Sequence, residues 1–320
     1  MNNIKHYVSD VSNLCGAEKL TVEEGKGKGV TLIRMYNGKI QLFLKQDKCL
    51  DILRADYKGE NICFITKNGL VSPKLNNSGA VNFLNGFDGG LLYTCGLDNI
   101  GAPTNINGRE CIQHGSISYI PAVNVNIETG ILDDNYYVTV SGIMKYTALF
   151  GSVLILKRKV TLKYMSDEII IEDEISNDSF SDDEYMLLYH INLGYPLLNE
   201  DAKITISDTE ITYFVNKKAE ENFANYKNFD KPTPNCLEEV FIHKLNGSKA
   251  FAELENKNLK FRVNFDTDKL KYLTQWKSMS CGDYVLGLEP ATTMLNKKEG
   301  LKIKQGEKHN YKINITITDR

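Results

Sequence analysis

Residues 160–175 read VTLKYMSDEIIIEDEI, and two short strands joined by a tight turn account for the whole stretch. The turn is Met165–Glu168, and on both sides of it apolar residues alternate with polar ones. Alternation with a period of two is typical of a strand with one buried and one solvent-exposed face. The alternating apolar positions are Val160, Leu162, Tyr164, Ile169, Ile171 and Ile175. The stretch therefore predicts an antiparallel sheet with one face in a core.

The same pattern recurs along most of the chain. Asn37-Gly38 is a typical hairpin turn between two apolar runs. Short strands separated by turn signals at roughly ten-residue spacing indicate a sandwich or barrel. We therefore predict an all-β protein, a single large antiparallel β-sandwich over residues 1–320, with residues 1–29 as an N-terminal extension packed on it. Within residues 1–20 the sequence favours a short helix, and the polar residues 217–234 are predicted to form a surface insertion.

Composition excludes several classes of partner. The chain has 320 residues, of which 42% are hydrophobic and 25% charged, as in soluble globular proteins. A net charge of −3 offers no electrostatic footprint for nucleic acid or an anionic membrane, and no apolar window reaches the length of a membrane span. The N-terminus lacks the apolar core of a signal peptide, and the seven cysteines are scattered without a CxxC pair. We expect a cytoplasmic monomer or homodimer that binds neither nucleic acid nor membrane.

A long tract, residues 68–121, departs from the strand pattern. It is rich in glycine and turn residues and carries Asp98, Asn99, Arg109 and His114. Long irregular tracts inside a compact domain are usually functional or disordered, and the aromatic and aliphatic residues of this one argue against disorder. Loops that carry titratable side chains on a β scaffold are where a binding or catalytic site is expected.

Two further stretches hold acid/base groups in apolar surroundings. LLYHINLGYPLL, residues 187–198, places His190 near the end of a strand before a turn, where it is either a cleft residue or a hydrogen-bonded core histidine. GLEPATT, residues 287–293, places Glu289 between Leu288 and Pro290. A carboxylate among apolar neighbours is rare, because burying its charge is unfavourable unless the group is paired or has a function. His243, in contrast, lies in the middle of a strand and is predicted to face solvent.

The chain contains no Ser-His-Asp elbow, no phosphate-binding loop and no metal-ligand cluster. Its 17 tyrosines and 13 phenylalanines suit a neutral polyol, because sugars present apolar ring faces to aromatic side chains. What remains is a set of acid/base groups on strand ends and loops, namely His114, His190, Glu289 and Asp98.

Five ordered motifs together resemble the aldose 1-epimerase (galactose mutarotase-like) superfamily, in its uncharacterised DUF4432-type branch. They are GGLLYTCGLDNIGAPT (89–104), QHGSISYIPA (113–122), LLYHINLGYPLL (187–198), LTQWK (273–277) and LGLEPAT (286–292). The resemblance extends from about residue 30 to the end of the chain. It implies a large β-sandwich with a sugar lying across a concave sheet, and neither a metal nor a cofactor.

The resemblance also implies roles for individual residues. Glu289 matches the catalytic base, His190 the catalytic acid, and His114 a sugar-binding histidine. Further candidate sugar contacts are Asp98, Asn99, Asn192, Arg54, Arg109, Gln275, Trp276 and Lys277. Trp276 is either a stacking platform or a core residue. Asp98 and Asn99 either contact the sugar or make local hydrogen bonds in a turn.

Two departures from the family pattern concern the substrate. Mutarotases of the superfamily carry an arginine in the loop that aligns with TCGLDNIG, whereas Ile100 follows Asn99 here. Arg54 or Arg109 is the candidate replacement. Ser116 stands where a basic residue is expected after the His-Gly motif. Two functions remain open at this stage: an aldose 1-epimerase acting on an aldose or a modified sugar, and a carbohydrate-binding protein without chemistry. A hexose-phosphate epimerase would additionally need a cluster of basic residues.

Overall fold

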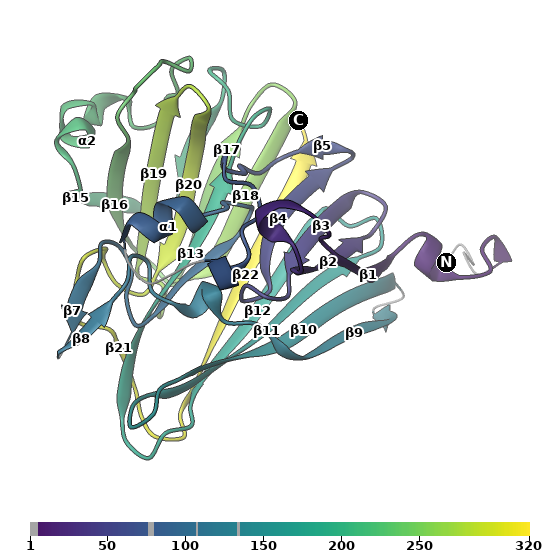
Figure 1. Ribbon diagram of the computed structural model, residues 1–320. Helices are drawn as coiled ribbons and strands as arrows, with labels where there is room; N and C mark the ends of the chain where they lie inside the picture. The colour runs from purple at the N-terminus through teal and green to yellow at the C-terminus, as the bar shows by residue number, and fades with distance from the viewer. Residues whose placement is uncertain (1–5, 76–79, 107, 133–134) are drawn as a thin grey trace.

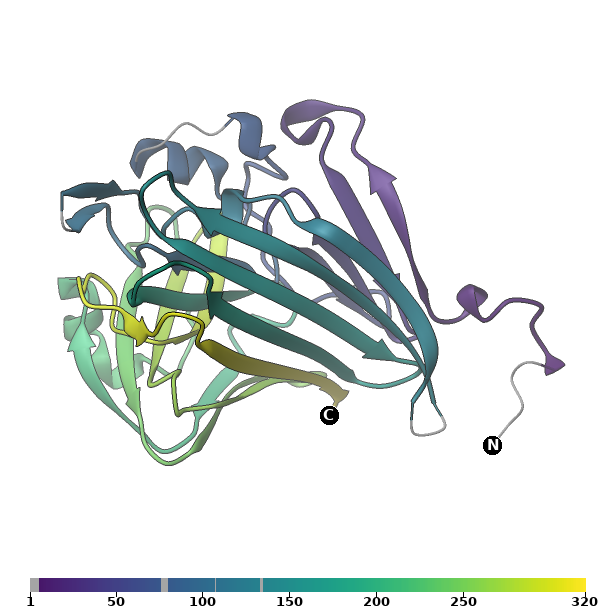
Figure 2. The same cartoon turned by 90° about the horizontal axis from the view of Figure 1, so that it is seen from below.

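The computed structural model describes residues 6–75, 80–106, 108–132 and 135–320, and strands dominate it (Figure 1). In Figures 1 and 2 one broad sheet forms a layer against which two other large sheets pack. Every pairing between the named strands is antiparallel. The prediction of an all-β antiparallel sandwich is confirmed.

The broad layer has eight strands. Their order across the sheet is β14 (Lys203–Ile206), β17 (Lys249–Glu255), β18 (Leu259–Asp266), β22 (Lys308–Asp319), β12 (Glu168–Asn177), β11 (Val153–Lys163), β10 (Asn135–Thr147) and β9 (Val123–Leu132). The β11–β12 hairpin contains residues 160–175, whose alternation predicted two strands joined by a turn. Ile169, Ile171 and Ile175 on β12 are each at most 1% exposed, as the alternation predicts. Burying a side chain of this size contributes about 1.5–3 kcal/mol relative to exposing it.

The other two large sheets differ in role. The five-stranded sheet follows the chain in order: β1 (Gly16–Thr21), β2 (Thr31–Tyr36), β3 (Ile40–Lys45), β4 (Asp51–Tyr57) and β5 (Glu60–Asn61). The seven-stranded sheet carries the candidate site. Its main order is β15 (Thr209–Phe214), β16 (Glu239–Leu245), β19 (Tyr272–Ser280), β20 (Asp283–Ala291), β13 (Asp183–Leu193) and β21 (Leu301–Ile303), with β6 (Tyr93–Leu97) also pairing with β13.

Helices are short, and a small hairpin completes the fold. The α-helices are α1 (Ala80–Gly86) and α2 (Lys217–Glu221). The 3-10 turns are η2 (Val11–Asn13), η3 (Gly25–Gly27), η4 (Pro73–Leu75), η5 (Ile117–Tyr119) and η6 (Phe223–Asn225), and the small hairpin is β7 (Thr104–Ile106) with β8 (Arg109–Cys111). Within the described residues, no helix combines the length and apolar composition needed to cross a membrane.

Charged side chains link the sheets inside the core. Arg158 of β11 is fully buried and pairs with Asp51 of β4 at 2.8 Å and with Asp173 of β12 at 2.7 Å. Nearby, the fully buried Lys45 and Lys48 both bind Asp88, at 2.8 and 2.7 Å. The three cations balance the three anions, as buried charges require.

Two local predictions are wrong. In the described part of residues 1–20 the predicted short helix is reduced to the three-residue 3-10 turn η2, and β1 follows it, paired along its whole length with β2. His243 is fully buried instead of solvent-facing. The reason is the segment 217–234, which covers the face of β16 on which His243 lies: the Tyr226 ring is 5.9 Å from the His243 ring.

Candidate active site

A cavity of about 270 Å³ opens on the seven-stranded sheet, near the lower end of the roughly 300–1,000 Å³ range of small-molecule sites. Strands β13, β16, β19 and β20 form its floor, and α1 and the loop around residue 101 form its walls. The residues lining it are Phe83, Leu84, Phe87, Gly101, Ala102, Gln113, His114, His190, Val215, Glu238, Val240, Thr274, Trp276, Glu289, Leu295 and Asn296. The cavity thus gathers His114, His190, Trp276 and Glu289 from distant parts of the sequence.

His190 and Glu289 contact each other on the cavity floor. The pairing of β13 with β20 brings their strands together, and Nε2 of His190 lies 3.3 Å from Oε1 of Glu289. Both residues are almost fully buried. Neither oxygen of Glu289 has a hydrogen-bond partner, and neither has Nδ1 of His190. Buried polar atoms without partners are rare in folded proteins, so these atoms are available to a ligand.

Burial favours the neutral form of both groups. It raises the pKa of Glu289 well above its usual range, with the nearby Glu238 adding to the shift. It lowers the pKa of His190 well below its usual range, helped by His114 and opposed by Asn192. A neutral carboxyl and imidazole hold the same number of protons as a carboxylate and imidazolium. The two forms therefore differ only in which of the two groups carries the proton.

His114 is held as a neutral hydrogen-bond donor. The backbone N–H of Gly101 donates to its Nδ1 at 3.4 Å, so Nε2 carries the ring proton. Burial lowers the pKa of His114 to about 4. The next residue, Gly115, has φ +73°, and a Cβ there would lie 2.3 Å from the carbonyl oxygen of Gly96. The backbone path thus requires the glycine of the His-Gly pair.

The alternation of β19 decides which of its residues reach the cavity. Thr274 and Trp276 face it, and Thr274 Oγ1 is buried without a partner. Gln275 and Lys277 point to the opposite face of the sheet. Gln275 binds His243 at 3.1 Å and the Tyr226 carbonyl at 2.7 Å, and Lys277 contacts Glu239 at 3.3 Å. The structure therefore places Gln275 and Lys277 outside the cavity.

The remaining candidate contacts also lie outside it. Asn192 donates to the carbonyl oxygens of Gly90 and His190, which fixes the strand beside the His190 side chain. Asp98 accepts hydrogen bonds from the N–H and hydroxyl of Ser116, next to the His-Gly pair. Asn99 donates to the carbonyl oxygens of Ala102 and Ile112. These side chains support the segments that carry His190 and His114.

Neither candidate arginine lines the cavity. Arg109 lies over the Tyr146 ring at 5.2 Å and 3.9 Å from Asp98, in a neighbouring cavity. Arg54 is half exposed on β4 and pairs with Asp56 at 2.9 Å. The arginine expected from the family resemblance therefore has no lysine or arginine in its place among the described lining residues.

Sequence reasoning missed several lining residues. Thr274 could have been inferred from its spacing of two from Trp276 on a strand. Glu238 carried no comparable signal, because it immediately precedes β16 and is brought to the cavity only by the pairing of β16 with β19. Its Oε2 accepts a hydrogen bond of 2.8 Å from the indole N–H of Trp276. Phe83 and Phe87 stack beside His114 and His190, with ring separations of 5.0 and 5.4 Å.

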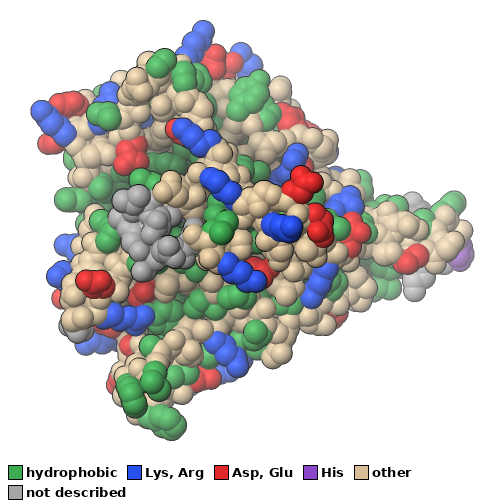
Figure 3. Space-filling view, in the orientation of Figure 1, with side chains coloured by type: hydrophobic (Ala, Val, Ile, Leu, Met, Phe, Trp, Pro, Cys, Tyr) green, Lys and Arg blue, Asp and Glu red, His purple; other side chains and the backbone are tan. Residues whose placement is uncertain are grey.

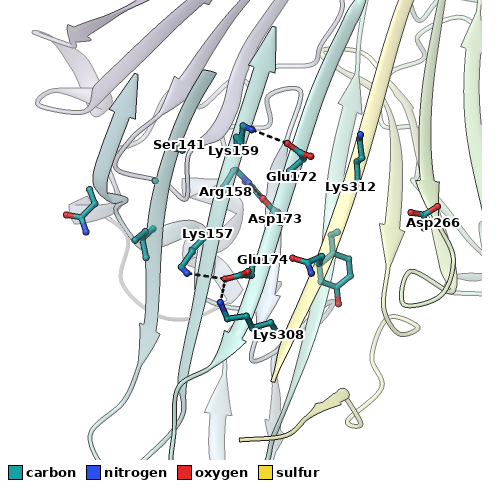
Figure 4. A pocket seen from close by; sticks show the side chains of 15 residues that line it. Ser141, Lys157, Arg158, Lys159, Glu172, Asp173, Glu174, Asp266, Lys308 and Lys312 are labelled. Carbon is teal, nitrogen blue, oxygen red and sulfur yellow. Dashed lines mark hydrogen bonds and ion pairs between the residues drawn. The ribbon is translucent and has the colours of Figure 1, made fainter. Parts of the chain in front are cut away.

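A larger hollow of about 680 Å³ lies on the outer face of the eight-stranded sheet (Figure 4). Its two glutamates are paired with its own lysines: Glu174 binds Lys157 and Lys308 at 3.1 Å each, and Glu172 lies 3.6 Å from Lys159. They differ in this from Glu289 of the smaller cavity, whose buried oxygens have no hydrogen-bond partner. On the face seen in Figure 3, charges of both signs are interspersed without a broad patch of one sign.

The sequence matches the model of the domain of unknown function DUF4432 over residues 27–317. The chain belongs to the DUF4432 family. No curated protein matches it. Among solved structures, a candidate aldose 1-epimerase from Klebsiella pneumoniae superposes with a TM-score of 0.87 at 21% identity, covering 99% of this chain and 86% of that one.

Two further solved structures share the fold at lower similarity. A galactose mutarotase-like protein from Clostridium acetobutylicum has a TM-score of 0.67 at 15% identity, covering 96% of this chain and all of that one. A galactose 1-epimerase from Lactobacillus acidophilus has a TM-score of 0.61 at 13% identity, covering 95% of this chain and 99% of that one. At these identities the likeness establishes the galactose mutarotase-like fold of this DUF4432 member.

The described residues contain no group of three or more His, Cys, Asp or Glu side chains arranged to hold a metal ion. The acid/base pair of the cavity is formed by the protein's own side chains.

Proposed function

We propose that this DUF4432 protein is an aldose 1-epimerase, an isomerase that interconverts the two anomers of an aldose or a modified sugar. The support is the Glu289–His190 pair: two buried groups of opposite acid/base type, in contact at 3.3 Å, whose carboxyl oxygens have no other partner. The shared fold of the mutarotase-like structures is consistent with this chemistry. A pure sugar-binding site has no need of such a pair.

The reaction follows from these groups. Proton transfer from Glu289 to His190 gives a carboxylate and an imidazolium. The carboxylate takes the proton of the anomeric hydroxyl while the imidazolium protonates the ring oxygen. The bond between C1 and the ring oxygen breaks as the C1 carbonyl forms. Rotation about C1–C2 and closure on the other face give the second anomer, and the two protons return. Each positioned proton transfer contributes about 10²–10⁴-fold.

The other lining residues have supporting roles in this proposal. The Nε2–H of His114 donates to a sugar oxygen, and the free hydroxyl of Thr274 binds beside Glu289, its cross-strand neighbour. Phe83 and Phe87 exclude water from the two histidines, and Trp276 offers an apolar face to the ring. The reaction needs no redox step and therefore no electron-carrying cofactor.

The cysteines bear on where this activity takes place. All seven are free thiols, and Cys15, Cys49, Cys63, Cys95 and Cys111 are buried. Unpaired thiols suit a reducing compartment. We place the proposed activity in the cytoplasm on this support.

Anomer exchange measured by NMR on a panel of aldoses tests the function. The wild-type protein is expected to accelerate exchange of at least one sugar, and Glu289→Gln to reduce the acceleration by about 10² or more, since the amide cannot accept the proton. A Glu60→Gln variant, on the remote strand β5, is the matched control and should behave as wild type. Sugar binding without any acceleration would instead support the carbohydrate-binding function.

A further inference from the structure

Glu238 stands at the mouth of the cavity with its charge exposed. Its side chain is solvent-accessible, in contrast to the buried Glu289 on the floor. The indole N–H of Trp276 donates to Oε2 at 2.8 Å and fixes the carboxylate against the cavity wall. The backbone carbonyl of Glu238 is also held, by the Asn216 side chain at 3.1 Å. A sugar in the cavity would therefore lie near this carboxylate.

No positive charge among the described lining residues compensates for the Glu238 carboxylate. The described lining residues include two glutamates and no lysine or arginine. Lys297 and Lys298, which follow the lining residue Asn296, line a separate cavity together with Lys271. A phosphate or carboxylate group on a ligand would therefore meet negative charge without a cationic partner.

We propose that Glu238 is a specificity-determining residue that excludes anionic sugars, so that phosphorylated and carboxylated aldoses are selected against. The proposal rests on the proposed epimerase function and adds the residue that sets its charge preference. Selection of this kind works by placing an unfavourable charge against the wrong ligand. The Trp276 hydrogen bond matters because it holds the carboxylate beside another residue that lines the cavity.

Matched pairs of sugars provide the test. D-glucose is compared with D-glucose 6-phosphate, and D-galactose with D-galacturonate, each relative to its own uncatalysed anomer exchange by NMR. For wild type, the kcat/KM of the uncharged member should exceed that of the charged member by tenfold or more. Glu238→Gln keeps an oxygen acceptor for the indole but loses the charge, so the ratio should fall at least threefold. Glu238→Lys should lower the ratio further, and Glu60→Gln should leave it unchanged.

The outcomes separate this proposal from the proposed function. Equal or faster exchange of the anionic sugars by wild type would overturn charge selection while leaving the epimerase intact. An unchanged ratio in both Glu238 variants would remove the role of Glu238. Exchange unaffected by Glu289→Gln would contradict the epimerase itself. If wild type accelerates no sugar, binding titrations of the same pairs decide the charge preference, and equal affinity for both members overturns it.

Discussion

At the scale of single residues, the candidate site depends on space that one glycine leaves open. Gly287 of β20 lies opposite Trp276 of β19 and two residues before Glu289. A Cβ at this position would lie 2.4 Å from Oε1 of Glu289 and 3.1 Å from Cβ of Trp276. Its backbone angles are ordinary for a strand, so the requirement is for volume rather than for a left-handed conformation. The missing side chain leaves the space in which the carboxyl group can contact His190.

Gly287→Ala is therefore expected to push the carboxyl group away from His190. A misplacement of about 1 Å can cost roughly 10²-fold in rate, and we expect a loss of that order in anomer exchange per folded molecule. Gly142→Ala is the matched control, because Gly142 is also a strand glycine with a close neighbour, Leu50 at 2.7 Å, but lies in the eight-stranded sheet. It should lower the melting temperature without this loss. Equal activity of the two variants would show that Gly287 does not position Glu289.

At the scale of elements, the strand pattern predicted much of the site but not the orientation of β19. The motif LTQWK correctly pointed to a site strand, yet three consecutive residues cannot all face one cavity. Both faces of β19 are buried, so its sequence lacks the polar–apolar alternation that reveals a solvent side. The cover comes from residues 217–234, whose polar composition predicted a surface insertion. Sequence alone does not disclose that such a segment folds back over Gln275 and His243.

This covered face predicts a pH dependence of stability. Burial lowers the pKa of His243 to about 4, with Lys227 adding to the shift and Gln275 opposing it. A depressed histidine pKa gives stability that is present above the unfolded value of 6.5 and lost as pH falls toward 4. The difference between the unfolded pKa of 6.5 and the folded pKa of about 4 corresponds to about 3 kcal/mol of folding stability. In urea unfolding at pH 7 and pH 4.5, His243→Gln should lose less stability on acidification than wild type. Parallel losses would mean that His243 is protonated in the fold.

At the scale of the whole molecule, the sandwich was predictable because alternation recurs in most strands, whereas the links between its layers were not. Arg158 and Asp51 lie 107 positions apart in sequence. Arg158 stands between two lysines, and from such a composition one expects its side chain to face solvent. In the structure Arg158 joins β11 to β4, and the Tyr189 hydroxyl of β13 donates to Asp173 at 2.9 Å. The broad sheet is thereby tied to both other large sheets, including the one that carries the site.

Removing the shared cation should test whether these links hold the layers together. Arg158→Met leaves Asp51 and Asp173 buried without their cation, and breaking a buried pair in this way costs about 3–5 kcal/mol. That is a large part of the roughly 5–15 kcal/mol by which a domain is stable. The triple variant Arg158→Met, Asp51→Asn, Asp173→Asn removes the stranded charges, so urea unfolding should show it to be more stable than the single variant. If the triple variant is instead the weaker of the two, hydrogen bonding by the aspartates, rather than charge balance, is what joins the sheets.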